Sequence, residues 1–416
     1  MTATYSDDTP AHASPAWMRL VPALLDDDPD EAAVTDALLD TVDLPVELGA
    51  LVEQLADLLE HATSAGTRRA YAADWADFTN WAGRHRLVAL PAEPRTVALY
   101  VTAHQDRLRP ATLLRRLSAI AVAHRGAAQP SPTGSELVRR AVAGLRRKHG
   151  ARPAGKTALV TAPLSAICAR LHALEINAAQ LAAAAAALQQ TAGASEQRRR
   201  LNKRLRAAQA TALRARRDRA LLLLGYAAAL RRSELVALDI ADLVETEHGL
   251  QIFIARSKTD QTGLGEFVGV AHGHPPDSCT ITCPVRAWAC WRDALARELD
   301  QLGEPLHPLA PAFRPLTRHG QLGAPGRLDA HSRLTGQSVA LIVKAAIALL
   351  DDPLAHPPER YAGHSRRAGF ATQAAAAGVP LDRIMRQTRH TSVAVALRYI
   401  RPGQIWHDNP SAALGL

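Results

Sequence analysis

The sequence contains few cysteines and few aromatic residues. Four cysteines occur in 416 residues, and Phe, Trp and Tyr together make up 4% of the chain. Four thiols in a chain of this length do not predict a disulfide framework, so we expect a reducing compartment, the cytoplasm. Alanine supplies much of the 47% hydrophobic fraction, which favours helices because alanine is the strongest helix former.

Long apolar segments are missing as well. The run at 220–230 lies between Arg219 and Arg231 and is far shorter than the about 20 residues that a membrane-spanning helix needs. The N-terminus is acidic and lacks the basic and then apolar stretch of a signal peptide. These absences predict a soluble protein that has no membrane partner.

Basic residues are nearly absent from the first 60 positions, where Arg19 stands against 14 acidic residues. We interpret residues 1–60 as an acidic, partly disordered leader; the alternatives are an intramolecular mimic of DNA and a contact between protomers. The rest of the chain holds 48 basic residues against 26 acidic ones. That excess is typical of proteins that bind polyanions.

The rare aromatic residues gather on one predicted helix. Tyr71, Trp75, Phe78 and Trp81 follow one another at spacings of four and three residues, which places them on one face of a helix. We interpret this face as core rather than as a surface for stacking nucleic-acid bases. Residues 61–150 are therefore predicted to form a helical domain.

Basic residues recur in clusters within the same helical block. A single pair of this kind is usually a solvated face, but contacts to DNA phosphates are independent of sequence and add up. The recurrence therefore predicts phosphate contacts by the clustered side chains, which are Arg68, Arg69, Arg115, Arg116, Arg139, Arg140, Arg146, Arg147 and Lys148.

A glycine- and proline-containing stretch follows this block. Residues 150–157, GARPAGKT, match the pattern of a phosphate-binding loop, but such a loop follows a buried strand, whereas the preceding residues here predict a basic helix. We interpret residues 151–157 as a linker between two domains.

The region that follows the linker is unusual in composition. At about 174–216 an alanine-rich stretch gives way, after Gly193, to a strongly basic one. The alanine content and the glycine break predict a pair of helices. Two readings stay open, a solvent-facing helical hairpin and a hairpin whose basic face contacts DNA or a neighbouring protomer.

The last third of the chain carries a set of residues suited to phosphodiester chemistry. His364 and Arg367 are three residues apart at the start of a predicted helix and so share a face. His390 follows at a turn, and Tyr399 closes the next short helical run. A tyrosine nucleophile with cations around the phosphate could cut DNA without a metal.

Two further cations lie upstream. Arg231 falls within a predicted buried helix at 218–238, where Glu234 is placed to orient it, because an unpaired arginine in so apolar a run is costly. Lys258 falls in a hairpin of a small sheet predicted at 243–271. Arg231 is a second candidate to bind phosphate oxygens, and Lys258 is a candidate acid.

Histidines and cysteines near the predicted sheet raise the question of a metal site. His272, His274, Cys279 and Cys283 are close in sequence, but their spacing is irregular for a zinc site and Cys283 lies at an expected strand-to-helix junction. We interpret these residues as core or surface positions and expect no metal and no other cofactor.

The order of these motifs resembles that of the tyrosine recombinase, or phage integrase, family. The resemblance covers about residues 61–416. Within the family, the chain resembles transposon-linked members. It implies a mainly α fold with a small antiparallel sheet, in which a helical core-binding (SAM-like) domain at 61–150 and a mixed α/β catalytic domain at 158–416 form a clamp on DNA. The segment at 174–216 is then an insertion in the catalytic domain. Arg366, within the His-x-x-Arg motif, and Arg232 depart from the family pattern.

The resemblance implies a site-specific recombinase that forms a 3′-phosphotyrosyl link and releases a 5′-hydroxyl. We expect Arg231 and Arg367 to bind the non-bridging oxygens, with His390 as a further hydrogen-bond donor. Lys258 is expected to protonate the leaving 5′-oxygen. The implied partners are double-stranded DNA with specific core sites and further protomers of a tetramer.

Tyr399 needs help to act as a nucleophile, because a free tyrosine has a pKa near ~10. His364 is expected to be the base that takes its proton. Alternatives to a recombinase are a DNA-relaxing topoisomerase with the same tyrosine chemistry and a catalytically inactive accessory protein that binds DNA. The expected location is cytoplasmic, with the protein on the nucleoid when DNA is bound.

Overall fold

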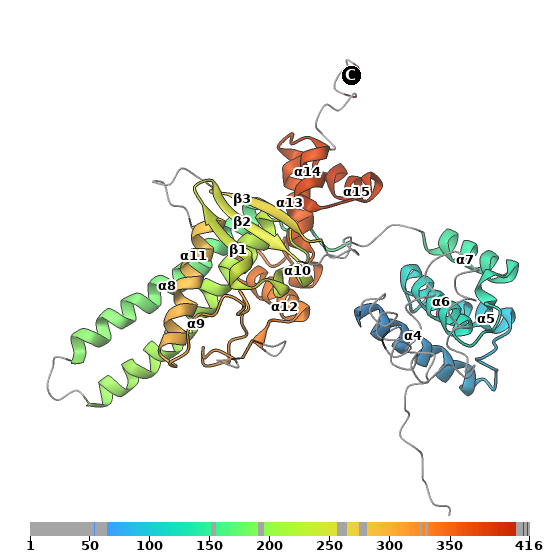
Figure 1. Ribbon diagram of the computed structural model, residues 1–416, viewed down its shortest axis with the longest axis horizontal. Helices are drawn as coiled ribbons and strands as arrows, with labels where there is room; N and C mark the ends of the chain where they lie inside the picture. Colours follow the sequence, from blue (N-terminus) through green and yellow to red (C-terminus); the bar gives the residue numbers. More distant parts are fainter. Residues whose placement is uncertain are drawn as a thin grey trace, which may run out of the picture. The chain divides into compact units, whose positions relative to one another are not determined.

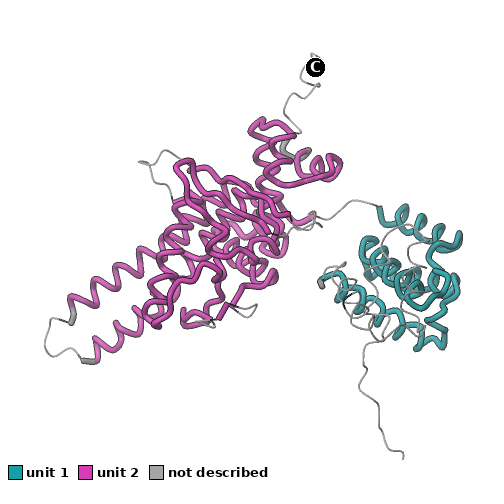
Figure 2. Tube along the Cα trace, in the orientation of Figure 1, with its two compact units in different colours: residues 1–154 teal, residues 155–416 magenta. Residues whose placement is uncertain are grey.

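A computed structural model gives the fold of the chain as two compact units, residues 1–154 and 155–416 (Figure 2). The residues that the structure describes are 54, 65–150, 155–189, 195–255, 264–273, 281–323, 327–328, 332–404, 411 and 414. The expected leader at 1–60, apart from residue 54, and most of the expected linker at 151–157 lie outside them.

Unit 1 is helical in its described part. Its elements are α4 (Ala65–Arg84), α5 (Pro94–His104), α6 (Pro110–Arg125), the 3-10 turn η2 (Pro132–Gly134) and α7 (Glu136–His149). Proline occupies the first position of α5 and α6, where its missing N–H costs nothing. Trp75, Phe78 and Trp81 are buried in one hydrophobic cluster, so the prediction that these aromatic side chains form core is confirmed.

Unit 2 begins with two long helices, α8 (Thr161–Gln189) and α9 (Ser195–Ala227). They lie side by side as a hairpin that extends beyond the rest of the unit (Figure 1). The predicted helix pair is therefore confirmed, while Gly193, the predicted break, lies outside the described residues. The C-terminal part of α9 is buried and carries the leucines of the core.

The single helix predicted at 218–238 is wrong. Helix α9 ends at Ala227, and the short helix α10 spans Arg232–Ala237. Between them Ala229 adopts a left-handed conformation with φ 48, and the Glu234 carboxylate accepts a hydrogen bond from the Arg231 N–H at 2.8 Å. This hydrogen bond between Glu234 and the residue that precedes the helix marks the start of a separate helix, α10, with Arg231 as its N-cap.

A three-stranded antiparallel sheet follows α10 and the 3-10 turn η3 (Ile240–Asp242), as predicted. Its strands, in the order β1-β2-β3, are β1 (Leu243–Thr246), β2 (Gly249–Ile254) and β3 (Glu266–Ala271). Thr246 pairs with Gly249, which leaves a two-residue turn. Alternate side chains of β2 and β3, including Leu250, Ile252 and Val268, are buried in the main core.

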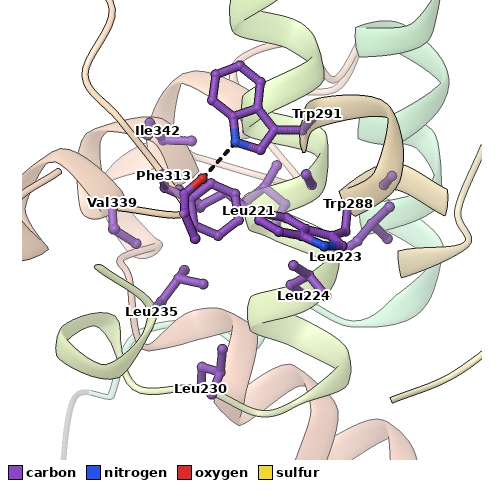
Figure 3. Packing of buried hydrophobic residues seen from close by; sticks show 14 of the residues in the cluster. Leu221, Leu223, Leu224, Leu230, Leu235, Trp288, Trp291, Phe313, Val339 and Ile342 are labelled. Carbon is purple, nitrogen blue, oxygen red and sulfur yellow. Dashed lines mark hydrogen bonds between the residues drawn. The ribbon is translucent and has the colours of Figure 1, made fainter. Parts of the chain in front are cut away.

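The core of unit 2 lies where α9 meets α11 (Pro284–Asp300) and α12 (Gly336–Ile347). Trp288 and Phe313 pack edge to face with their ring centres 5.9 Å apart. The Trp291 indole N–H donates to the Ala312 carbonyl at 2.8 Å (Figure 3). The Trp291 ring thus fills core volume while its polar atom is satisfied by the backbone.

Three helices close the unit, after the 3-10 turn η5 (Pro358–Arg360). They are α13 (Ser365–Ala376), α14 (Leu381–Thr388) and α15 (Val393–Gln404). Helix α13 packs on both α9 and α15, and Gly369 lets it approach the backbone of Leu159, which a Cβ there would overlap. Because α9, α10 and α13 meet here, motifs more than 130 residues apart in sequence come together. None of the helices in the described part of the chain is both long and apolar enough to cross a membrane.

Candidate active site

The Tyr399 side chain lies between two histidine rings. Its hydroxyl is 2.9 Å from His364 Nε2, and its ring stacks on that of His390 with centres 5.5 Å apart and planes 3° from parallel. Helix α15 is held to α13 by the Thr372 hydroxyl, which donates to the Tyr399 carbonyl at 2.9 Å. The structure thus brings together three of the residues that the sequence singled out.

His364 is the group placed to take the phenol proton. It is the N-cap of α13. Burial, and then the neighbouring Arg367 and Arg231, lower its pKa from the ordinary value, so the ring is neutral at pH 7. A neutral imidazole can accept from the tyrosine hydroxyl at the 2.9 Å that separates them.

His390 is held in one tautomer by Thr388. The Thr388 hydroxyl donates to the Ile384 carbonyl at 2.7 Å, and its oxygen is 2.9 Å from His390 Nδ1. With its only proton engaged, the hydroxyl accepts from Nδ1–H, which leaves Nε2 without a proton in the neutral ring. Burial, followed by Arg367 and Arg231, lowers the pKa of His390 to about 4. His390 therefore becomes a donor through Nε2 only when an anion nearby favours its protonation.

Arg231 is oriented by the carboxylate of Glu234, as the sequence predicted. The guanidinium donates through Nη1 to Glu234 Oε1 at 2.5 Å, while Oε2 accepts from the Arg231 N–H. Only 1% of the Glu234 side chain is exposed. Burial alone would raise its pKa, but Arg389 and the hydrogen bonds from Arg231 lower it below the ordinary value. The carboxylate is therefore charged and fixes the side chain of Arg231.

Arg367 is buried beside Arg231 with part of its guanidinium unused. Nη1 donates to the Ala229 carbonyl at 2.8 Å, while Nη2 is buried and has no hydrogen-bond partner among the described residues. Burial, followed by Arg231 and Arg389, lowers the pKa of Arg367 to about 9, so it stays charged at pH 7. A buried, charged donor without a partner suits an anionic ligand.

A third arginine of the site, Arg389, was missed by sequence reasoning. It has a left-handed backbone with φ 53 at the end of α14, and its Nη2 donates to Glu234 Oε2 at 2.8 Å in a buried ion pair. Its guanidinium also donates to the carbonyls of Ala228 and Ala229. Arg389 thus stabilises the turn before α10, which carries Arg231 and whose Ala229 carbonyl accepts a hydrogen bond from Arg367.

Comparison with known proteins decides the family. The chain is 33% identical over 356 residues to the integrase/recombinase XerD homologue of Selenomonas ruminantium, which covers 84% of this chain and 86% of that protein. The chain belongs to the tyrosine recombinases. These are enzymes that transfer DNA strands.

Other comparisons with known proteins are weaker. No family model matches the recombinase chain. The crystal structure of the XerH site-specific recombinase bound to palindromic difH substrate, a post-cleavage complex, is 13% identical with a TM-score of 0.49, over 95% of this chain and 93% of that one. The Tn1549 transposon integrase in complex with a circular intermediate DNA is 12% identical with a TM-score of 0.38, over 74% and 80% of the two chains.

Two arginines next to the motif arginines have different positions in this recombinase. Arg366 is fully buried against α9, where it donates to the Leu221 carbonyl at 3.2 Å. A Cβ at Gly225 would overlap its Nη1, and burial lowers the pKa of Arg366 to about 10. Arg232 is exposed. Arg367, rather than Arg366, is therefore the arginine of this motif whose charge acts together with that of Arg231 in the active site.

Some predicted residues lie outside the described part of the recombinase. Lys258 falls in the gap at 256–263, and His274 and Cys279 fall in the gap at 274–280. Among the described residues, no group of three or more His, Cys, Asp or Glu side chains is arranged to hold a metal.

The predicted DNA-binding arginines of unit 1 differ in their surroundings. Arg115 donates through two nitrogens to Asp74, at 2.7 and 3.0 Å. Arg116 binds Asp77, and only 13% of its side chain is exposed. Arg116 is largely withdrawn from solvent, because acidic residues of α4 lie between the aromatic core positions and pair with α6.

Most of the exposed cations in the predicted set of unit 1 lie on α7. Arg139 pairs with Glu136, and Lys148 lies 3.6 Å from Asp106. The remaining arginines of α7 are exposed and make no hydrogen bond or ion pair with the described residues; they are Arg140, Arg146 and Arg147. Arg68 and Arg69 lie at the start of α4. Of the predicted set, α7 thus offers the most cations without a protein partner.

Proposed function

We propose that this tyrosine recombinase is site-specific and cuts and rejoins DNA strands through a covalent link to Tyr399. The observation that carries the proposal is the 2.9 Å contact between the Tyr399 hydroxyl and His364 Nε2, beside Arg231 and Arg367. A nucleophile, its base and cations for the phosphate are the parts that a transesterification needs.

The first step moves two protons and exchanges one ester bond. His364 Nε2 takes the phenol proton as the Tyr399 oxygen attacks phosphorus. The bond from phosphorus to the 5′-oxygen breaks, which leaves a 3′-phosphotyrosyl link, and Lys258 supplies the proton for the departing 5′-hydroxyl. The reverse reaction with a different 5′-hydroxyl rejoins the strands. Because the link keeps the ester energy, no nucleoside triphosphate enters the scheme.

The arginines serve the negative charge that builds on the phosphate. Arg367 offers its unpartnered Nη2, and Arg231 offers the guanidinium N–H groups that neither Glu234 nor the Arg389 carbonyl occupies. Both are held in place before the substrate arrives, so little reorganisation is needed during the reaction. His390 joins them as a donor through Nε2 once the bound phosphate favours its protonated form.

Glu234 and Arg389 act on the substrate only through these cations. The Glu234 carboxylate joins Arg231 to Arg389, and Arg389 fixes the carbonyls of Ala228 and Ala229. Ala229 in turn accepts from Arg367. We therefore assign Glu234 and Arg389 as positioning residues. Exchange between two duplexes requires four active sites, so the proposed assembly is a tetramer on two DNA core sites.

The test is a trapping experiment that needs no known target. A pool of nicked duplexes with randomised cores is incubated with the protein in a chelator, and protein–DNA adducts are isolated on denaturing gels and sequenced. We expect adducts enriched in one core sequence, and none with Tyr399→Phe. Tyr226→Phe is the matched control, since Tyr226 lies on α9 and its hydroxyl contacts Thr161.

The possible outcomes separate the candidate functions. Adducts with no sequence preference, together with relaxation of supercoiled plasmid by single protomers, support a topoisomerase. Binding to one core sequence without any adduct supports an accessory protein and overturns the catalytic assignments. Adducts that persist in Tyr399→Phe show that another residue is the nucleophile.

A further inference from the structure

A basic groove runs along the α8–α9 hairpin, away from the active site. Its volume is about 1290 Å³, and its walls come from α8, α9, α11 and the turn at 317–321. In Figure 1 the C-terminal end of α8 and the N-terminal end of α9 lie at the opposite end of unit 2 from the helix α15, which carries Tyr399. Lys203 precedes Ala227, the last residue of α9, by 24 positions, or about 36 Å along the helix at about 1.5 Å per residue.

The groove carries a strong excess of positive charge. Its lining contains two carboxylates, Glu175 and Glu298, and seven cations, which are Arg199, Lys203, Arg206, Arg214, Arg216, Arg297 and Arg318. Glu175 is buried and already paired with Arg216 at 2.9 Å. Only Glu298 is left to offset the other cations.

Four of the cations are exposed and have no partner within the described part of the chain. Arg199, Lys203, Arg206 and Arg297 make no hydrogen bond or ion pair with the described residues. The first three follow one another at spacings of four and three residues, so they form one row on α9. This row is about 10 Å long, and a DNA strand presents a phosphate about every 3.4 Å along the duplex axis. The row can therefore serve about three phosphates.

The turn at 317–321, which packs on α9 just beyond this row, is rigidly built. Arg214 donates to the Thr317 carbonyl at 2.9 Å and to the Arg318 carbonyl. Gly320 has φ +80 and packs so closely on α9 that a Cβ would overlap Ala210. The turn is thereby fixed to the helix, with Arg318 exposed at its edge. Six of the lining residues are alanines of α8 and α9, whose small side chains give little apolar area for docking a protein.

We propose that this groove binds the phosphate backbone of duplex DNA outside the cleavage site. The free cations supply the attraction, and the small alanine side chains of the lining leave room for the backbone to approach the row on α9. Such contacts carry no sequence information and set affinity and register instead. The proposal rests on the proposed function only in taking DNA as the polyanion that the protein meets.

The test compares two double variants of the full chain that remove the same charge. Lys203→Gln/Arg206→Gln empties the groove of two free cations. Arg200→Gln/Arg204→Gln removes two cations of α9 that do not line it. Binding to a random-sequence duplex of about 40 base pairs is measured by fluorescence anisotropy between about 50 and 200 mM salt.

We expect the groove variant to bind about tenfold more weakly near physiological salt, and its slope of log affinity against log salt to fall by about 2. The control variant should keep both values close to those of the unaltered protein. Equal losses in the two variants, or no loss in the groove variant, overturn the proposal.

Two further arms identify the occupant of the groove and keep its test apart from that of the active site. The acidic segment of the same chain is the rival occupant, so a peptide of residues 20–40 is titrated in place of DNA. If the groove variant loses this peptide but keeps its DNA affinity and salt slope, the groove belongs to that segment. Adduct formation by the groove variant on nicked duplexes tests the proposed function separately. If the groove variant loses affinity for random-sequence DNA but still forms adducts, the proposed groove is supported. If no variant forms adducts, only the proposed chemistry at Tyr399 is overturned.

Discussion

The active site and the hairpin groove both use arginine, but the side chains are buried and paired in the active site and exposed in the groove. Arg367 is 2% exposed and held by the Ala229 carbonyl, and Arg389 is paired in a buried site with Glu234. Arg199 and Arg206 are exposed and unpaired within the described part of the chain. A buried guanidinium acts through the direction of its N–H groups, whereas a solvated one acts through its charge alone.

The difference follows from what surrounds each half of α9. Its C-terminal half is enclosed by core, so every polar group that enters must be paired or aimed at a ligand. Its N-terminal half stands in the hairpin, where water solvates exposed cations such as Arg199 and Arg206 at no such cost. An arginine-to-lysine substitution, which keeps the charge, should therefore impair function in the active site far more than in the groove.

The largest expected effect comes from changing the shape of a cation while its charge is kept. Arg367→Lys loses the planar fork, so one ammonium cannot serve both the Ala229 carbonyl and a phosphate oxygen. We expect the rate of adduct formation to fall about 100- to 1,000-fold, as when one preorganised donor is lost. The measurement is single-turnover trapping on a selected nicked duplex.

Arg206→Lys is the matched change in the groove and should leave both adduct formation and salt-dependent DNA binding within about twofold. Equal losses in the two lysine variants would break the comparison, because they would show that the exposed arginine also acts through its shape.

An intermediate effect is expected where backbone strain and side-chain function can be separated. Arg389 has a left-handed backbone, which costs a non-glycine residue about 1 kcal/mol or more. Arg389→Gly removes this cost but also removes the guanidinium that braces Glu234 and the 228–231 turn. We expect adduct formation to fall about 10- to 100-fold and unit 2 to be destabilised, because losing the buried ion pair with Glu234 costs more than the relieved backbone strain returns.

Ala229 provides the control for this experiment. It is also left-handed, with φ 48, but it contributes its carbonyl rather than its side chain. Ala229→Gly should keep full activity and stabilise unit 2 by up to about 1 kcal/mol. An active Arg389→Gly would show that the guanidinium is dispensable and that the residue matters only for its backbone.

Local pattern predicted those features of the site that depend on neighbours in sequence. The pairing of Arg231 with Glu234 spans three residues, and the burial of Trp75, Phe78 and Trp81 follows from helical periodicity. The mainly α fold with a small antiparallel sheet was predicted on the same grounds, helped by the family resemblance. These features require little knowledge of tertiary contacts.

What could not be predicted depends on contacts between distant segments. The pairing of Arg389 with Glu234 joins residues 155 positions apart, and nothing in the local sequence marks a left-handed arginine. The direction of Arg366 depends on the space that Gly225 leaves on another helix. The end of α9 at Ala227 was missed because residues 220–230 are continuously apolar, so their periodicity does not reveal a break.

The smallest expected effect is the influence of the exposed Arg232 charge on the pKa of His364, the proposed base. Burial, and then Arg367, Arg231, Arg366 and Arg232, lower the pKa of His364. The rate of adduct formation should therefore stay flat as pH falls through about 6.5, the ordinary histidine value, and decline only below the lowered pKa, where His364 becomes protonated. Removing one of these cations raises the pKa and moves the decline to higher pH.

Arg232→Gln tests this, because Arg232 is exposed and makes no contact with the Tyr399 hydroxyl. We expect the midpoint of the acid limb to rise by less than about one pH unit, since water screens an exposed charge. Arg232→Lys keeps the charge and should leave the midpoint in place. A midpoint that falls in Arg232→Gln, or that moves equally in Arg232→Lys, would contradict His364 as the base and would leave the phenol proton to another acceptor.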